Sequence, residues 1–64
     1  MHQATEQVLR FFEYDHLPPA LQEVSKPFHE LALDCAGKYE GAEVTAGLRK
    51  LLEAKDCIVR AALG

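Results

Sequence analysis

The stretch HLPPALQEVSKPFHELA, residues 16–32, contains all three prolines of the chain and also its clearest helical pattern. A residue before proline is displaced from the helical conformation, whereas proline itself is well tolerated in the first turn of a helix. A helix is therefore predicted to begin near Pro18 or Pro19, after a break at YDHLPP, and to stop near Gly37. Its apolar positions have helical spacing and continue through Pro27; they are Leu21, Val24, Phe28, Leu31, Ala32 and Cys35.

Pro27 is the unusual residue of this predicted helix. Inside an exposed helix a proline removes one backbone hydrogen bond and costs about 3 kcal/mol. A structural interpretation is a kink that wraps the helix around its neighbours, or a helix that restarts with Ser25 as N-cap. A functional interpretation is that the bend opens backbone groups near Ser25 and Lys26 to a ligand. The sequence leaves both interpretations open.

Two further helices are predicted on either side of this stretch. The first runs from about Ala4 to Glu13, where Val8, Phe11 and Phe12 form a stripe that Leu9 widens, so both phenylalanines are expected in the core. The third follows the short connection GKYEG and runs almost to the C-terminus. Its apolar residues are Val44, Leu48, Leu51, Leu52, Ile58, Val59, Ala62 and Leu63. The prediction is an all-α domain, residues 1–64, with a short N-terminal helix and an antiparallel hairpin.

The length of the chain predicts self-association. A domain of 64 residues buries too little surface to be comfortably stable alone. Cys35 and Cys57 are expected to be reduced, buried thiols too far apart to pair, and no zinc site or cofactor is predicted. The third helix is apolar over an arc wider than one neighbour can cover, so a homo-oligomer is predicted.

Charge and motifs exclude several classes of function. A net charge of -3 argues against a protein that coats DNA or anionic lipid. No run is long enough to span a membrane, and a cytoplasmic protein is expected. HELALD lacks the second histidine of a zinc protease motif, and Asp15 with His16 has no nucleophile placed by any known motif. A hydrolase is therefore a weak hypothesis for this chain.

The break and the helix after it contain the candidate binding residues. Tyr14 lies beyond the stripe of the first helix and is free to stack on a nucleobase. Lys26 and His29 lie three residues apart on one helix face, where either can meet a phosphate, although solvation alone explains a surface lysine. The full set of candidate ligand contacts is Phe11, Tyr14, His16, Lys26, His29, Arg49 and Arg60.

Two segments carry a family resemblance over residues 11–63. They are F.EYDHLPPALQEVSKPFHELA and AEVTAGLRKLLEAKDCIVRAAL, which resemble the helical hairpin domain of phage anti-CBASS sponge proteins, also found in some anti-Thoeris sponges. The resemblance rests on the overall pattern and on no catalytic signature. It implies a non-enzymatic protein of the infected bacterial cytoplasm that sequesters cyclic oligonucleotide messengers and so blocks antiphage signalling. It also implies compact homo-oligomers, typically hexamers, with ligand pockets between subunits.

The resemblance also assigns roles to individual residues. The family's aromatic residue near the first break corresponds to Tyr14, and its basic residue on the second helix corresponds to Lys26 or His29. Binding through His29 would weaken as the pH rises and the imidazole loses its proton. Cyclic trinucleotides are a second ligand class, for which Arg49 or Arg60 are candidates. The alternative function is a helical structural or interaction module, and a weaker one is a regulatory subunit that recruits an enzyme.

Overall fold

The computed structural model describes residues 2–64, and this part of the chain is helical with no strand. The elements are α1 (Gln3–Leu9), the short 3₁₀-helix η1 (Arg10–Phe12), α2 (Pro19–Lys38) and α3 (Ala42–Leu63). The all-α prediction is confirmed. The first helix is shorter than expected, because its last turn tightens into η1 and the chain becomes extended at Glu13.

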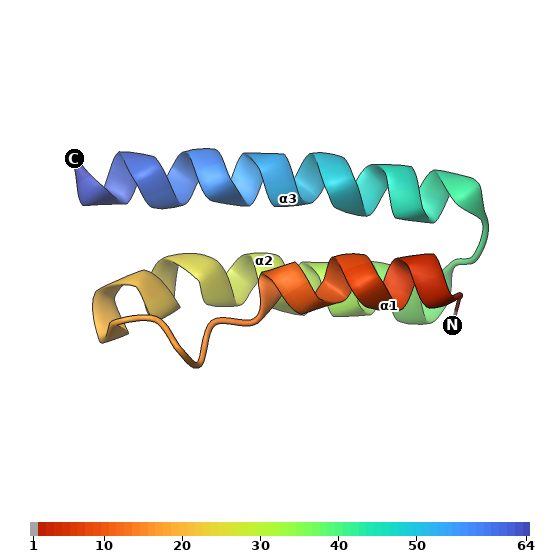
Figure 1. Cartoon of the computed structure of the whole chain (residues 1–64), viewed down its shortest axis with the longest axis horizontal. Coiled ribbons are helices and arrows are strands. Elements are labelled where there is room, and N and C mark those ends of the chain that lie inside the picture. Colours follow the sequence, from red (N-terminus) through yellow and green to blue (C-terminus); the bar gives the residue numbers. More distant parts are fainter. Residues whose placement is uncertain (1) are drawn as a thin grey trace.

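The helices lie side by side in an elongated bundle of 35 × 18 × 16 Å. Figure 1 shows α2 and α3 antiparallel to each other, with α1 lying over α2 and running in the opposite direction. Because α1 and η1 together are much shorter than α3, they cover only the half of the hairpin near its turn. The other half consists of the beginning of α2, the end of α3 and the segment that joins η1 to α2.

Local chemistry fixes where α2 and α3 begin. Pro18 is the N-cap of α2 and Pro19 occupies its first turn, as predicted. Gly41 precedes α3 with a φ of 112°, a conformation that favours glycine, and no side chain caps this helix. The helix α2 ends at Lys38, one residue past the predicted stop at Gly37, where Tyr39 becomes extended.

The helix α2 runs continuously through Pro27. Ser25 is 1% exposed within this helix, and its hydroxyl has no hydrogen-bond partner, so the predicted restart with Ser25 as N-cap is wrong. Pro27 itself is exposed, which places its ring away from the core. The backbone carbonyl that loses its hydrogen bond to Pro27 therefore lies on a side of the helix that water can reach.

The core is small and lies where α1 and η1 meet the hairpin. Its buried apolar residues are Val8, Phe12, Ala32, Ala36 and Leu48. Thr5 and Thr45 add a polar contact, with their hydroxyl oxygens 3.1 Å apart. Alanines on α2 allow α1 and η1 to approach closely, and Phe12, with no exposed surface, fills the centre.

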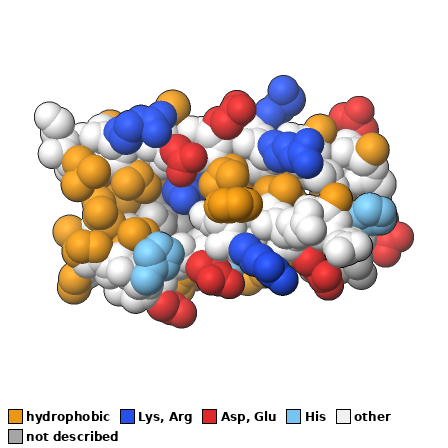
Figure 2. Space-filling model, viewed as in Figure 1, with side chains coloured by type: hydrophobic (Ala, Val, Ile, Leu, Met, Phe, Trp, Pro, Cys, Tyr) orange, Lys and Arg blue, Asp and Glu red, His pale blue; other side chains and the backbone are white. Residues whose placement is uncertain are grey.

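Several residues expected in the core lie on the surface instead. Phe11 is 65% exposed although Phe12 beside it is buried, because the 3₁₀ turn directs only one of two consecutive side chains inward. Cys35 is half-buried and Cys57 is exposed, so the prediction of two buried thiols is wrong for Cys57. Figure 2 shows apolar side chains gathered over the end of the molecule that α1 does not reach. The large exposed apolar residues are Phe11, Leu31, Leu33, Tyr39, Ile58 and Leu63.

Candidate ligand-binding surface

The elbow, residues 13–18, joins η1 to α2 and carries two of the candidate contacts. The N–H of Leu17 donates to the carbonyl of Tyr14 over 3.0 Å. The side-chain amide of Gln22, in the first turn of α2, donates to the carbonyls of Leu17 (2.8 Å) and Asp15 (3.4 Å). These bonds tie the backbone of the elbow to α2.

The structure brings Tyr14 and His29 together. Their ring centroids are 5.4 Å apart and their planes are inclined by 73°, an edge-to-face contact. Such pairs contribute about 0.5–1.5 kcal/mol beyond the area they bury. Both residues are half-buried, so part of the tyrosine ring faces solvent while the histidine holds its orientation.

Lys26 lies on α2 one turn before His29 and points into solvent. Its side chain is 59% exposed, and its ammonium is 3.9 Å from the carboxylate of Glu30. An exposed ion pair of this spacing on a helix contributes only a few tenths of a kcal/mol. The ammonium can therefore leave Glu30 for a stronger anionic partner at little cost.

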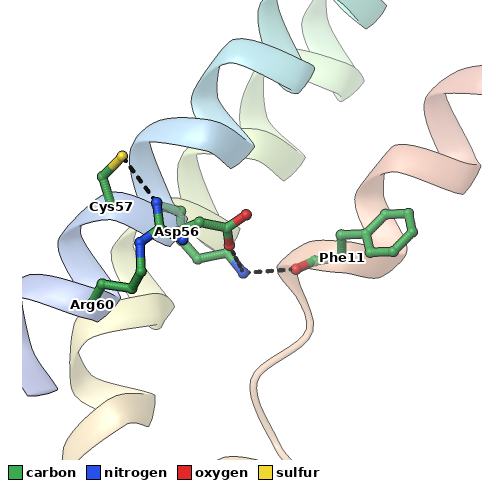
Figure 3. Close-up of polar contacts among 5 residues, drawn as sticks. Phe11, Asp56, Cys57 and Arg60 are labelled. Atoms are coloured by element: carbon green, nitrogen blue, oxygen red, sulfur yellow. Dashed lines mark hydrogen bonds and ion pairs between the residues drawn. The ribbon is translucent and has the colours of Figure 1, made fainter.

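Phe11 and His16 frame the elbow. The side chain of Phe11 is exposed before it, and His16 is exposed at its turn. The carbonyl of Phe11 accepts a hydrogen bond of 3.0 Å from the ammonium of Lys55 on α3, as Figure 3 shows. This bond satisfies one of the free carbonyls at the end of η1 and connects η1, just before the elbow, to α3.

Lys55 contributes to the candidate surface although the sequence did not single it out. Only 12% of its side chain is exposed, and its ammonium also lies 3.1 Å from Asp56. A signal was present, because Lys55 follows Leu48 by seven residues and Leu52 by three and so shares their face of the helix. It is a cation held between a backbone carbonyl and a carboxylate.

The two arginine candidates lie in different parts of α3. Arg49 lines a hollow of about 350 Å³ at the start of α3, together with His2 and Thr45. Arg60 lies in the last turns of α3, where its guanidinium donates to the sulfur of Cys57 over 3.3 Å (Figure 3). Arg49 is thus near the hairpin turn, at the end of the bundle remote from the elbow (Figure 1).

A second hollow lies between α2 and α3 and has mainly apolar walls. Its volume is about 540 Å³, and Glu40 and Glu43 lie at its edge near the hairpin turn. We call it the interhelical groove. Its other lining residues are Leu31, Cys35 and Tyr39 on or beside α2, and Val44, Gly47, Leu48 and Leu51 on α3.

Comparisons with known proteins add no identification. No protein-family model matches the chain, and no curated protein and no solved structure is similar to it. Within residues 2–64, no three side chains of His, Cys, Asp or Glu are grouped as metal ligands, and no helix combines the length and apolarity of a membrane span. The resemblance to sponge proteins stays a prediction from the sequence.

Proposed function

We propose that this protein is a homo-oligomeric helical sponge that binds cyclic oligonucleotides tightly and releases them chemically unchanged. The observation that supports this function is the contact between Tyr14 and His29 next to the exposed ammonium of Lys26. An aromatic ring held in place beside a mobile cation offers stacking for a base and charge for a phosphate. The resemblance noted above places the action in the infected bacterial cytoplasm, against antiphage signalling.

The geometry favours a division of roles between Lys26 and His29. The imidazole of His29 is half-buried and occupied by its contact with Tyr14. The ammonium of Lys26 is more exposed and only weakly paired. We therefore assign the phosphate contact to Lys26, the base contact to Tyr14, and the support of the tyrosine ring to His29. Phe11 and His16 border the same site.

One chain offers only half of what a cyclic dinucleotide presents. The ligand has two bases and two phosphates, whereas the elbow region of one chain offers one ordered tyrosine and one lysine. Exposed carboxylates of Glu13, Asp15 and Glu30 further weaken the attraction of a single chain for an anion. Two copies related by a two-fold axis would supply matching pairs, so one dinucleotide is expected per two chains. In a hexamer, such pairs would recur around the assembly.

Isothermal titration calorimetry with a panel of cyclic dinucleotides and trinucleotides tests this proposal. We expect saturable binding to at least one member, followed by recovery of the intact nucleotide after heat denaturation of the protein. Recovery of a linear product would show catalysis. An absence of heat and of any melting-temperature shift across the panel would rule out the sponge function.

Two variants and two matched controls test the site. Tyr14→Ala and Lys26→Ala should each lower the affinity for the bound dinucleotide by about tenfold or more. Tyr39→Ala and Lys50→Ala, at exposed positions away from the elbow, should leave it within about twofold. Unchanged affinity in the Tyr14→Ala, Lys26→Ala double variant would place the ligand elsewhere, with the hollow at Arg49 as the next site to test for trinucleotides.

The apolar interhelical groove favours one alternative function. A helical module whose association with its copies or with a partner protein is the function would need such a surface and no nucleotide site. Under this alternative the calorimetric panel gives no binding, while the protein still associates in solution. The alternative is rejected if nucleotide binding is stoichiometric and depends on Tyr14.

A further inference from the structure

A second apolar stripe runs along α3 outside the core, and we call it the outer seam. Its residues alternate in steps of three and four, which is the heptad spacing of helices that pair along their length. Large residues recur every seven positions, and small residues recur every seven positions between them. In order, the outer seam is Val44, Gly47, Leu51, Ala54, Ile58 and Ala61.

The chain itself leaves most of the outer seam without a neighbour. Gly47, Ala54 and Ala61 are exposed, and Ile58 retains 49% of its surface. A Cβ atom added at Gly47 would meet nothing within 4 Å. Gly47 therefore makes no close helix contact within this chain. A glycine in mid-helix is unfavourable, so its lack of a side chain calls for a contact from outside.

The interhelical groove has the form of a hole that receives a side chain. Val44, Gly47, Leu48 and Leu51 stand at positions i, i+3, i+4 and i+7, the four residues that surround a knob in knobs-into-holes packing. Leu31 and Cys35 of α2 provide a second wall. The volume of about 540 Å³ leaves room for a large apolar side chain at Gly47.

We propose that a second copy of this chain fills the groove, with the two α3 helices antiparallel along their outer seams. In an antiparallel pair, the large position of one helix faces the small position of the other. Ile58 of each copy then faces Gly47 of the other, and Leu51 faces Ala54. Val44 likewise faces Ala61, so every layer pairs a large residue with a small one. A two-fold axis near the middle of α3 relates the copies, and each copy gives a knob and offers a hole.

A parallel pair would not have this fit. It would set Leu51 against Leu51 and Ile58 against Ile58, whereas Gly47 would face Gly47. Layers would alternate between crowded and empty, and both overpacking and voids are unfavourable. The pattern of sizes therefore selects the antiparallel orientation.

Charge at the edge of the groove agrees with this orientation. Glu40 and Glu43 lie at the edge of the groove beside the start of α3, and Arg60 follows Ile58 by two residues. The antiparallel pairing brings the acidic start of one α3 next to the basic end of the other, and it also opposes the two helix dipoles. If the end of the second α3 were acidic or uncharged, Glu40 and Glu43 would gain no electrostatic attraction from it. The proposal concerns the association named under the proposed function but does not depend on the nucleotide.

Sedimentation velocity without nucleotide tests the interface. The wild-type protein should form dimers or larger assemblies at about 100 µM. Gly47→Leu should raise the dissociation constant of this interface at least about tenfold, by filling the hole. Leucine is a better helix former than glycine, so this variant should keep its circular dichroism spectrum. Gly37→Leu is the matched control, since a Cβ added there also meets nothing within 4 Å, and it should associate as the wild type does.

Rescue by a second substitution tests the orientation. In the Gly47→Leu, Ile58→Ala double variant, an antiparallel pair again sets a large residue against a small one, so association should recover by about tenfold relative to Gly47→Leu. A parallel pair would leave leucine facing leucine, with no recovery. A monomeric wild type, or association unaffected by Gly47→Leu, overturns the proposed interface. Absence of rescue overturns the antiparallel pairing, whereas nucleotide binding is measured separately by the calorimetric panel.

Discussion

Two faces of α3 have the same spacing and different surroundings. The inner seam consists of Thr45, Leu48, Leu52, Lys55 and Val59, and its side chains are buried or half-buried. The outer seam holds residues at the same intervals, but four of its six members are exposed. Periodicity alone marks both faces as contact surfaces. The positions of α1 and α2 decide which of the two faces is covered by the same chain.

The difference follows from the reach of the other helices. The helix α1 has 7 residues and α3 has 22, and α1 with η1 packs on one side of the hairpin only (Figure 1). The inner seam therefore meets α1, η1 and α2, whereas the outer seam has only the edge of α2. We infer that the inner seam determines the stability of the single chain and the outer seam its association.

The largest difference in unfolding free energy is expected when one large apolar residue in each seam is replaced by alanine. Leu48 is 3% exposed in the inner seam and Ile58 is 49% exposed in the outer one. Leu48→Ala should lower the free energy of unfolding by about 2–5 kcal/mol, because it leaves a cavity in a small core. Ile58→Ala should lower it by less than about 1 kcal/mol in the dissociated chain.

Urea unfolding followed by circular dichroism, at concentrations where the chains are dissociated, measures this pair of variants. Sedimentation velocity on the same proteins should show the reverse ranking: Ile58→Ala should weaken association more than Leu48→Ala does. The comparison is made after correction for the fraction of Leu48→Ala chains that is unfolded. Equal losses of unfolding free energy would contradict the division of α3 into two seams.

The next effect concerns Lys55, the charged member of the inner seam. Lys55→Ala should cost about 1–2 kcal/mol of unfolding free energy, because the carbonyl of Phe11 at the end of η1 loses its donor. The elbow would become less ordered, so the affinity for a nucleotide held by Tyr14 should also fall. Urea unfolding and calorimetry provide the two measurements. Lys50→Ala, on the exposed face, is the control and should change neither quantity appreciably.

The helices were predictable from sequence because their signals are local. The prolines at 18 and 19 mark the start of α2, and the stripe through Phe28 and Ala32 identifies its core side. The apolar stripe of α3 and its extent to the C-terminus were equally clear. The exposure of Phe11 was not predictable, since it depends on the tightening of one turn into η1. Ser25 was a candidate N-cap because serine is favoured at that position, yet it lies buried inside α2.

The candidate site was predictable only in its residue types. Tyr14, Lys26 and His29 were selected for their chemistry, but the contact between Tyr14 and His29 depends on how the elbow turns back onto α2. Lys55 was missed because a lysine is ordinarily solvated, and its hydrogen bond to the carbonyl of Phe11 depends on where η1 ends. Local spacing places Lys55 on the inner face of α3, but it does not show which atoms of other elements the ammonium meets.

A smaller effect is expected from the hydroxyl pair that joins α1 to the inner seam. Thr5 is 4% exposed, and its hydroxyl lies 3.1 Å from that of Thr45. Thr5→Val or Thr45→Val alone should cost about 1 kcal/mol, because each leaves the other hydroxyl without a partner. The double variant should cost less than the sum of the two. Thermal and urea unfolding of all four proteins complete the cycle, and strict additivity would mean that the hydroxyls do not interact.

The smallest effect has the opposite sign and lies on the outer seam. Gly47→Ala should raise the unfolding free energy of the dissociated chain by about 0.5–1 kcal/mol, since alanine is the better helix former and its methyl group meets nothing within 4 Å. The same methyl group should weaken association slightly, because it enters the hole that a second copy uses. Gly41→Ala is the contrasting control: its φ of 112° is strained for alanine, so it should destabilise the fold by about 1 kcal/mol. A Gly47→Ala protein that is less stable when dissociated would mean that Gly47 serves the single chain, and the comparison of seams would fail at that position.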